Sequence, residues 1–148
     1  MTASPLDGKA EAFLRANHAA AMVTLRADGS PNAVRIGVAL VDGKLWSSGT
    51  QERRRTRWLR RDPRCTLFVF PTGGGYEYLG LDTKVTILEG DDVPELSVAL
   101  FQAMQPDAKP GMLTWMGTEM TLDDFRQAMR DDHRLLYQFE VERAYGIY

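Results

Sequence analysis

The sequence predicts a mainly β protein with a few short helices, folded as a small antiparallel barrel that is closed or nearly closed. In several short segments apolar residues alternate with a period of two, which is typical of strands with one buried face. Turn signals such as Asp42-Gly43 separate these segments. The segments with helical spacing are short and fall between about six predicted strands, a pattern that favours a barrel.

The first third of the chain predicts a helix followed by a β-meander. Asp7 suits the helix N-cap, because its carboxylate can accept hydrogen bonds from the free amides of the first turn. Asp42-Gly43 is a two-residue hairpin turn between the last two strands. In order, the expected elements are a helix over 5–16 and strands over 19–25, 32–41 and 44–48.

The rest of the chain alternates between the two periods. Pro63 ends a helix over the arginine-rich residues that precede it, because a residue before proline disfavours the helical region. Thr121 begins a capping-box pattern, which indicates a helix start. The remaining expected elements are strands over 65–71, 76–80 and 84–89, a helix from Pro94, an irregular piece over 105–119, a helix from 121 to about 131, and a last strand over 135–141 that resumes at 144–147.

Length and composition predict one ordinary globular domain over residues 1–148, with 44% hydrophobic and 26% charged residues. No apolar run approaches ~20 residues and no signal-peptide pattern opens the chain, so we expect no membrane span. The single cysteine, Cys65, cannot form an internal disulfide, which fits the cytoplasm. His18 and His133 have no Cys or His at metal-ligand spacing, so no metal site is expected.

The most informative segment is the arginine segment, residues 53–64. It holds seven arginines and one acid, Asp62, and so carries +6 in a chain whose net charge is −2. Such a local reversal of sign indicates a site for an anion. The remaining charge of −8 would repel a long polyanion, and no row of aromatic residues accompanies the arginines, which argues against nucleic acid.

Three features next to this segment predict a phosphate site. Arg35 lies on a strand face whose other residues are small, so a flat ligand could approach it closely. Hydroxyl groups and flexible backbone follow at a strand end, in Ser47, Ser48, Gly49 and Thr50. The helix that begins next adds free amides and guanidinium groups. The residues of this helix start that could bind the phosphate are Arg53, Arg54, Arg55, Thr56 and Arg57.

Other polar residues have simpler interpretations. Arg60, Arg61 and Arg64 are expected to be solvated surface groups that pair with nearby acids. Tyr76, which follows three glycines, is by itself more typical of a half-buried strand aromatic than of a stacking platform. No Ser-His-Asp set, paired carboxylates or metal ligands can be assembled, so we name no catalytic residue and expect no hydrolytic chemistry.

At this point the chain resembles a known family. The opening helix and meander, the turn Asp28-Gly29-Ser30-Pro31, Arg35 and the run from Arg55 to Arg64 resemble the flavin-binding split β-barrel of the pyridoxamine 5'-phosphate oxidase superfamily. The runs 123–129 and 143–147 resemble more narrowly its actinobacterial branch, which uses the deazaflavin coenzyme F420. The resemblance covers nearly the whole chain.

The resemblance implies a homodimer with two cofactor sites at the subunit interface. It places Arg53, Arg55, Thr56 and Arg57 in the phosphate-binding turn, Arg35 at a phosphate arginine of flavin mononucleotide (FMN) enzymes, and Tyr76 where the second subunit brings an aromatic towards the ring system. Oxidase members often have lysine at the position of Arg55. The chain ends at Tyr148, without the longer segment that grips pyridoxamine phosphate, so pyridoxine metabolism is not expected.

These observations favour F420 over FMN as the cofactor. FMN ends in one phosphate, whereas F420 continues from a phosphodiester into a tail of glutamate carboxylates, for which Arg54 and Arg57 provide further cations. The expected activity is hydride transfer from reduced F420 to an electron-poor conjugated small molecule. An FMN oxidase or reductase and a non-catalytic cofactor-binding protein remain the alternatives, and the sequence does not identify the acceptor.

Overall fold

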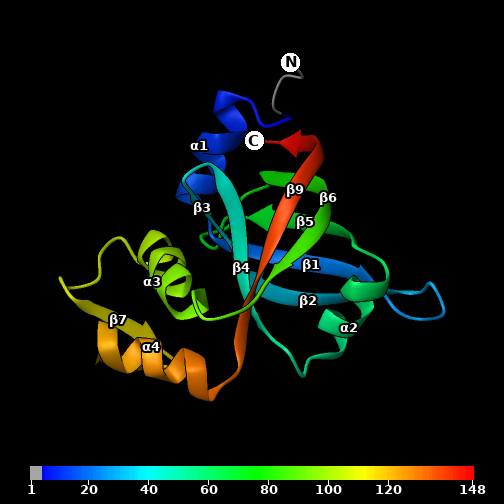
Figure 1. The fold of residues 1–148 in the computed structure, drawn as a ribbon. Helices are drawn as coiled ribbons and strands as arrows, with labels where there is room; N and C mark the ends of the chain where they lie inside the picture. The colour runs from blue at the N-terminus through cyan, green and yellow to red at the C-terminus, as the bar shows by residue number, and fades with distance from the viewer. Residues whose placement is uncertain (1–4) are drawn as a thin grey trace.

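The body of the molecule is a curled antiparallel sheet of seven strands (Figure 1). The structure, a computed structural model, describes residues 5–148. The strand order is β2-β1-β5-β6-β9-β4-β3. Only Val38 separates β2 from β3 in the chain, so the two edges of the sheet meet there and the sheet curls into a half-barrel. This confirms the predicted mainly β split-barrel fold. The predicted domain also includes residues 1–4, which lie outside the described residues.

The elements follow one another along the chain as four helices and nine strands among the described residues. They are α1 (Gly8–Ala16), β1 (Ala19–Leu25), β2 (Pro31–Gly37), β3 (Ala39–Val41), β4 (Lys44–Thr50), α2 (Arg54–Arg61), β5 (Arg64–Phe70), β6 (Tyr78–Leu88), α3 (Val93–Met104), β7 (Met112–Trp115), β8 (Thr118–Thr121), α4 (Leu122–Asp131) and β9 (Arg134–Ile147). As predicted, Asp7 caps α1, and its Oδ1 accepts from the amide of Ala10 at 2.7 Å.

The strand expected over 32–41 is in fact two strands. β2 pairs with β1, and β3 pairs with β4 through the predicted turn at Asp42-Gly43. β4 then pairs with β9 and not with β2, so the expected meander is interrupted. At the change of partner, the amide of Val38 donates to the carbonyl oxygen of His18 at 2.9 Å. The apolar alternation runs unbroken through this point, which is why it did not reveal the corner.

Three other predicted segments differ from the structure. The two strands expected over 76–80 and 84–89 are one strand, β6, whose register shifts between Asp82 and Thr83. A bulge of this kind admits an extra residue without ending a strand. The last strand is likewise continuous. The piece over 105–119 contains most of a hairpin, β7–β8, whose turn residues Met116 and Gly117 both have positive φ.

Two hydrophobic cores lie on either side of β4 and β9. Leu45 and Tyr137 point into the half-barrel, whereas their neighbours Trp46 and Leu136 point outwards against α3, α4 and the β7–β8 hairpin. Because successive side chains of a strand point to opposite faces, β4 and the first half of β9 are buried on both sides.

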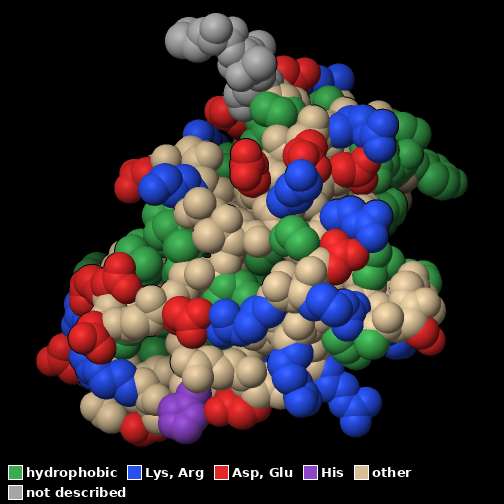
Figure 2. All heavy atoms as spheres, turned by 45° about the vertical axis from the view of Figure 1, so that its right-hand side comes forward, with side chains coloured by type: hydrophobic (Ala, Val, Ile, Leu, Met, Phe, Trp, Pro, Cys, Tyr) green, Lys and Arg blue, Asp and Glu red, His purple; other side chains and the backbone are tan. Residues whose placement is uncertain are grey.

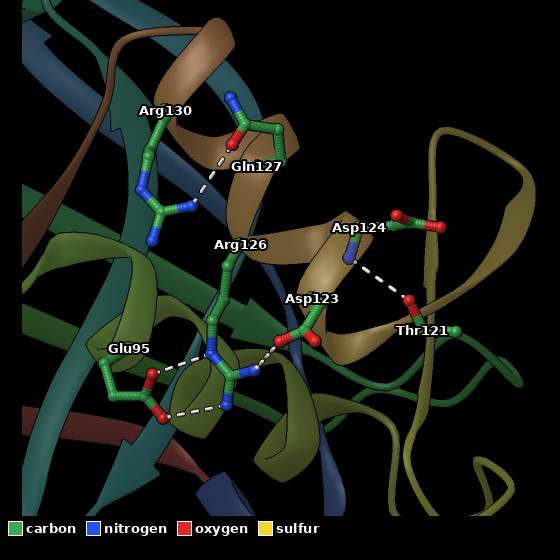
Figure 3. A network of polar contacts seen from close by, with 7 residues as sticks. All are labelled: Glu95, Thr121, Asp123, Asp124, Arg126, Gln127 and Arg130. Atoms are coloured by element: carbon green, nitrogen blue, oxygen red, sulfur yellow. Dashed lines mark hydrogen bonds and ion pairs between the residues drawn. The ribbon is translucent and has the colours of Figure 1, made fainter.

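Ion pairs on the surface tie α4 to α3 (Figure 3). The guanidinium of Arg126 binds Glu95 of α3 at 2.7 Å and Asp123 of its own helix at 2.8 Å. The predicted cap is present, because Thr121 Oγ1 accepts from the amide of Asp124 at 3.2 Å. Within residues 5–148, no helix has both the length and the apolar character needed to cross a membrane.

Candidate anion-binding site

The predicted site residues are centred on the connection between β4 and α2. Thr50 ends the strand, Arg53 is the N-cap of the helix, and no side chain caps the first turn. The amide of Gln51 donates to the carbonyl oxygen of His133 at 3.3 Å, which attaches the connection to the start of β9. A short, tethered strand-to-helix connection of this kind presents its side chains in fixed directions.

Buried hydroxyl groups bind this connection to the sheet. Thr56 is completely buried, and its Oγ1 donates to the carbonyl oxygen of Thr50 at 2.7 Å. The same oxygen lies 2.5 Å from the hydroxyl of Tyr137, which is also completely buried. Gly49 packs against that tyrosine so closely that a Cβ at this position would lie 2.5 Å from the ring. The first turn of α2 is therefore anchored to β4 and β9.

Arg55 is a buried cation that faces this anchor. It is 9% exposed, and the carbon of its guanidinium lies 5.8 Å from the centre of the Tyr137 ring. Among the described residues, none bonds to its Nε. Burial lowers the pKa of Arg55, and Arg53 lowers it further by repulsion, while Tyr137 acts in the opposite direction. Because a buried charge without a counter-ion is costly, the arrangement favours an anion from outside the described chain.

The anion would enter a hollow of about 390 Å³, here called the arginine hollow. Its walls come from the β1–β2 hairpin and from α2, and they are Arg26, Asn32, Val34, Arg53, Arg54, Arg55 and Trp58. Four of these seven residues are arginines, and none of the described residues in the lining is acidic. In Figure 2, Lys and Arg side chains gather at the lower right, where α2 lies. The local potential is strongly positive.

The structure brings only part of the predicted set into this hollow. Arg53, Arg54 and Arg55 line it, whereas Arg57 lies exposed on α2. Ser47 is 1% exposed and donates to the carbonyl oxygen of Gly37 at 2.7 Å, so it closes the barrel corner. Ser48 Oγ is buried and has no partner among the described residues.

Two predicted residues lie apart from the arginine hollow. Arg35 points to the other face of β2 and lines a separate hollow of about 590 Å³ with His18, Phe70 and Met104. The alternation of a strand causes this, since the neighbouring Val34 faces the arginine hollow. Tyr76 is 93% exposed in the loop before β6, so it is not the half-buried strand aromatic that its position in the sequence indicated.

Several residues of the site were missed from the sequence. Arg26 directly follows β1 and is fixed by its own hairpin, with one guanidinium nitrogen donating to the carbonyl oxygen of Pro31 at 2.6 Å. Its position beside the turn at 28–31 was the one available signal. Tyr137 gives none, because it is one apolar position in a buried strand. The guanidinium of Arg134 lies 4.5 Å from the centre of the Trp115 ring. Burial lowers the pKa of Arg134, and repulsion from Arg53 lowers it further.

The second half of the arginine segment has protein partners. Arg60 makes two hydrogen bonds with Glu89, at 2.9 and 3.1 Å. Arg64 pairs with Asp62 at 2.8 Å and holds the pKa of that carboxyl at about 2. The expectation that Arg60 and Arg64 pair on the surface is confirmed, whereas Arg61 is exposed and forms no ion pair among the described residues.

Comparison with known proteins assigns the chain to a family. A family model described as pyridoxamine 5'-phosphate oxidase matches residues 6–148. The chain belongs to the pyridoxamine 5'-phosphate oxidase family. Members of this family bind flavin-type cofactors, and their fold is typical of oxidoreductases.

Several solved structures share this fold, although their sequence identity to the chain is low. An F420 reductase is 17% identical with a TM-score of 0.68, over 91% of this chain and 94% of the other. A conserved hypothetical protein from Mycobacterium tuberculosis is 16% identical with a TM-score of 0.70, over 96% and 84%. The heme storage protein HutZ from Vibrio cholerae is 16% identical with a TM-score of 0.65, over 95% and 94%. These similarities establish the fold alone.

The arginine hollow suits the phosphate group of the flavin-type cofactors that this family binds. Arg55 Nε is a buried donor without a partner among residues 5–148, and Arg55 lines the arginine hollow. Phosphate oxygens accept hydrogen bonds from guanidinium groups. The described residues form no metal-binding group of three or more His, Cys, Asp or Glu, and burial raises the pKa of Cys65 to about 12, which makes its thiol unreactive.

Proposed function

We propose that the protein is an F420-dependent oxidoreductase that reduces an electron-poor conjugated small molecule. The observation that carries this proposal is the arginine hollow, in which four arginines face one another without a carboxylate. A single terminal phosphate brings one anionic group to the hollow, whereas a phosphodiester followed by carboxylates brings several, so it can use the whole set of arginines. The cations beyond the buried Arg55 therefore favour F420 over FMN.

In this proposal each residue has a separate task. Arg53 and Arg55, which line the arginine hollow, bind the phosphodiester. Arg54 and Arg26 face the carboxylates of the tail, and Arg57, exposed on the same helix, adds charge at the entrance. When bound, reduced F420 supplies a hydride. The protein fixes the cofactor's orientation and excludes water, which are its usual contributions in cofactor enzymes.

We further propose that the working form is a homodimer. Phe68 is 43% exposed on the outer face of the sheet and stacks on Tyr78, with ring centres 4.9 Å apart. Tyr145 and Ile147, at 40% and 60% exposure, add apolar surface on β9, where they pair with Gly80 and Tyr78 of β6. Tyr76 extends away from its own subunit, so its expected contact with a cofactor would be made across the dimer. Analytical ultracentrifugation tests the assembly, and a monomer would contradict it.

The cofactor assignment is tested by the spectrum of the purified protein and by titration. We expect colourless protein that quenches the fluorescence of added F420 on binding, with an affinity that rises with the number of glutamates in the tail. In the Arg54→Ala variant this rise should flatten, while the matched Arg61→Ala variant on the same helix keeps it. Yellow protein with a flavin spectrum would instead establish the FMN alternative.

Catalysis is tested separately from binding. Reduced F420 is mixed with the protein and a panel of conjugated acceptors, such as activated alkenes and quinones, and its reoxidation is followed by absorbance. Acceptor-dependent turnover supports an enzyme. Tight binding without turnover for any acceptor would support a non-catalytic cofactor-binding protein.

A further inference from the structure

We propose that Tyr137 is a positioning residue for the anion site: through Thr56 it fixes the first turn of α2, and its ring holds Arg55 in the orientation that meets the anion. The inference deepens the proposed function, and it rests on that function only in placing an anionic group at Arg55. Tyr137 itself lies beneath the site and is not a ligand.

The direction of the hydrogen bonds follows from the groups involved. The carbonyl oxygen of Thr50 can only accept, so the hydroxyl of Thr56, 2.7 Å away, donates its one proton there. The contact between Thr56 Oγ1 and the Tyr137 hydroxyl, at 2.5 Å, must then use the proton of the tyrosine. The chain therefore runs from Tyr137 to Thr56 to Thr50, and every proton in it is used.

This chain links the parts of the site that must keep their places. Thr50 is the last residue of β4, Thr56 lies in the first turn of α2, and Tyr137 lies in β9. β4 and β9 are neighbours in the sheet, where Tyr137 pairs with Ser47. All three hydrogen-bonded residues are at most 9% exposed, so water does not compete for their bonds. The turn that bears Arg53 and Arg55 is thereby attached to two neighbouring strands whose paired residues are buried.

The same tyrosine supports Arg55 directly. The guanidinium lies over the ring with its carbon 5.8 Å from the ring centre, in the range of a cation–π contact. Arg53 repels it, and none of the described carboxylates pairs with it. Without the ring and the anchored turn, a long arginine side chain would move towards solvent. Holding it in place before binding lowers the ordering cost that the ligand must meet.

A double-mutant cycle tests this role. Tyr137→Phe keeps the ring and removes only the hydroxyl, and Arg55→Ala removes the side chain that the hydroxyl is inferred to serve. We expect Tyr137→Phe to weaken F420 binding about 3- to 10-fold in the wild-type background, as for one lost hydrogen bond. In the Arg55→Ala background we expect less than about a 2-fold effect, because the two residues act through one another.

A tyrosine outside the site provides the matched control. Tyr148 packs against Phe13 of α1, with ring centres 6.4 Å apart, and belongs neither to the arginine hollow nor to the apolar surface proposed for the dimer, so Tyr148→Phe should leave the affinity unchanged. An equal loss from Tyr137→Phe in both backgrounds would show a general structural effect and overturn the positioning role. No loss in the wild-type background would overturn it as well.

A second pair of variants keeps the test decisive if Tyr137→Phe does not fold. Thr56→Ser retains the hydroxyl and should bind F420 as the wild type does, whereas Thr56→Val removes it and should repeat the loss. Weak binding by both variants would mean that the methyl group, not the hydrogen bond, matters.

The same titrations, run with FMN, separate this inference from the cofactor assignment. If the wild type binds FMN and not F420, the F420 assignment fails, and the double-mutant cycle is then measured with FMN as the ligand. If it binds neither ligand, both proposals fail.

Discussion

The two halves of the arginine segment carry the same kind of side chain but occupy different electrostatic environments. Arg53, Arg54 and Arg55 face the arginine hollow, whose described lining contains no acid. Arg60 and Arg64 are exposed and are paired with Glu89 and Asp62. Because paired surface charges contribute little, the unpaired half is where a ligand can gain binding energy. The density of positive charge indicates that an anion binds, and the distribution of acids indicates where.

The largest expected effect is on Arg55 itself. Arg55→Met keeps much of the apolar volume and removes the charge, so we expect anion binding to weaken by about 1.5–3 kcal/mol, roughly 10- to 150-fold. The free protein should unfold at the same temperature or higher, because an unpaired buried cation is removed. Fluorescence titration and thermal unfolding measure the two quantities. A lower melting temperature with unchanged affinity would show that Arg55 is structural.

The next largest effect is expected below the turn, at Gly49. A methyl group there would lie 2.5 Å from the Tyr137 ring, so Gly49→Ala must displace a completely buried side chain. Overpacking of this kind costs about 1–3 kcal/mol of folding stability. Cofactor affinity should fall too, because the ring supports Arg55. Gly73→Ala is the control, since a Cβ at that loop position meets nothing within 4 Å. Equal melting temperatures for the two variants would contradict the close packing.

The sequence predicts best those elements whose ends carry strong local signals. The Asp7 cap and the Asp42-Gly43 turn are examples, and both are confirmed. The strand expected over 32–41 was wrong because the corner at Val38 is created by a change of pairing partner. Partner choice depends on contacts distant in the sequence, which no local period records.

The site follows the same rule. Arg53, Arg54 and Arg55 are found by charge density, because they are adjacent in the chain. Which arginines are unpaired depends on Glu89, far along the sequence, and on the folding of the β1–β2 hairpin that brings Arg26 beside α2. Tyr137 has no sequence signal at all, since burial makes it look like any core aromatic. Binding residues are therefore easier to predict than the residues that hold them.

A smaller effect is expected where the charges are paired. Arg60→Ala removes an exposed bond to Glu89, so stability should change by no more than about 0.5 kcal/mol. Anion affinity should stay within about 2-fold of the wild type, because the side chain does not line the arginine hollow. The measurement is a side-by-side titration with Arg55→Met. A comparable loss of affinity in both variants would mean that the whole segment acts as one diffuse positive surface.

The smallest effect is expected at the junction before the unpaired half, where His133 contacts Glu52 at 2.8 Å. Glu52 raises the pKa of His133, and His133 lowers the pKa of Glu52. A group whose folded pKa is raised stabilises the folded state fully below its unfolded pKa, which is about 6.5 for histidine. This stabilisation is lost as pH rises through the folded pKa. The carboxylate's contribution is present above its unfolded pKa of about 4.3 and is lost on acidification. The pair therefore stabilises most between these limits.

His133→Gln isolates this contribution. The melting temperature of the variant should fall slightly below that of the wild type near pH 5.5, and the difference should vanish above the raised pKa of His133. Both side chains are mostly exposed, at 65% and 64%, so the effect should shrink further in high salt. Affinity for F420 should be nearly independent of the substitution at a pH above the raised pKa of His133, where the wild-type imidazole is neutral. A loss of affinity at that pH would mean that the contact at residue 133 positions the turn by shape rather than by charge, and the anion site would then depend on residues upstream of Arg53.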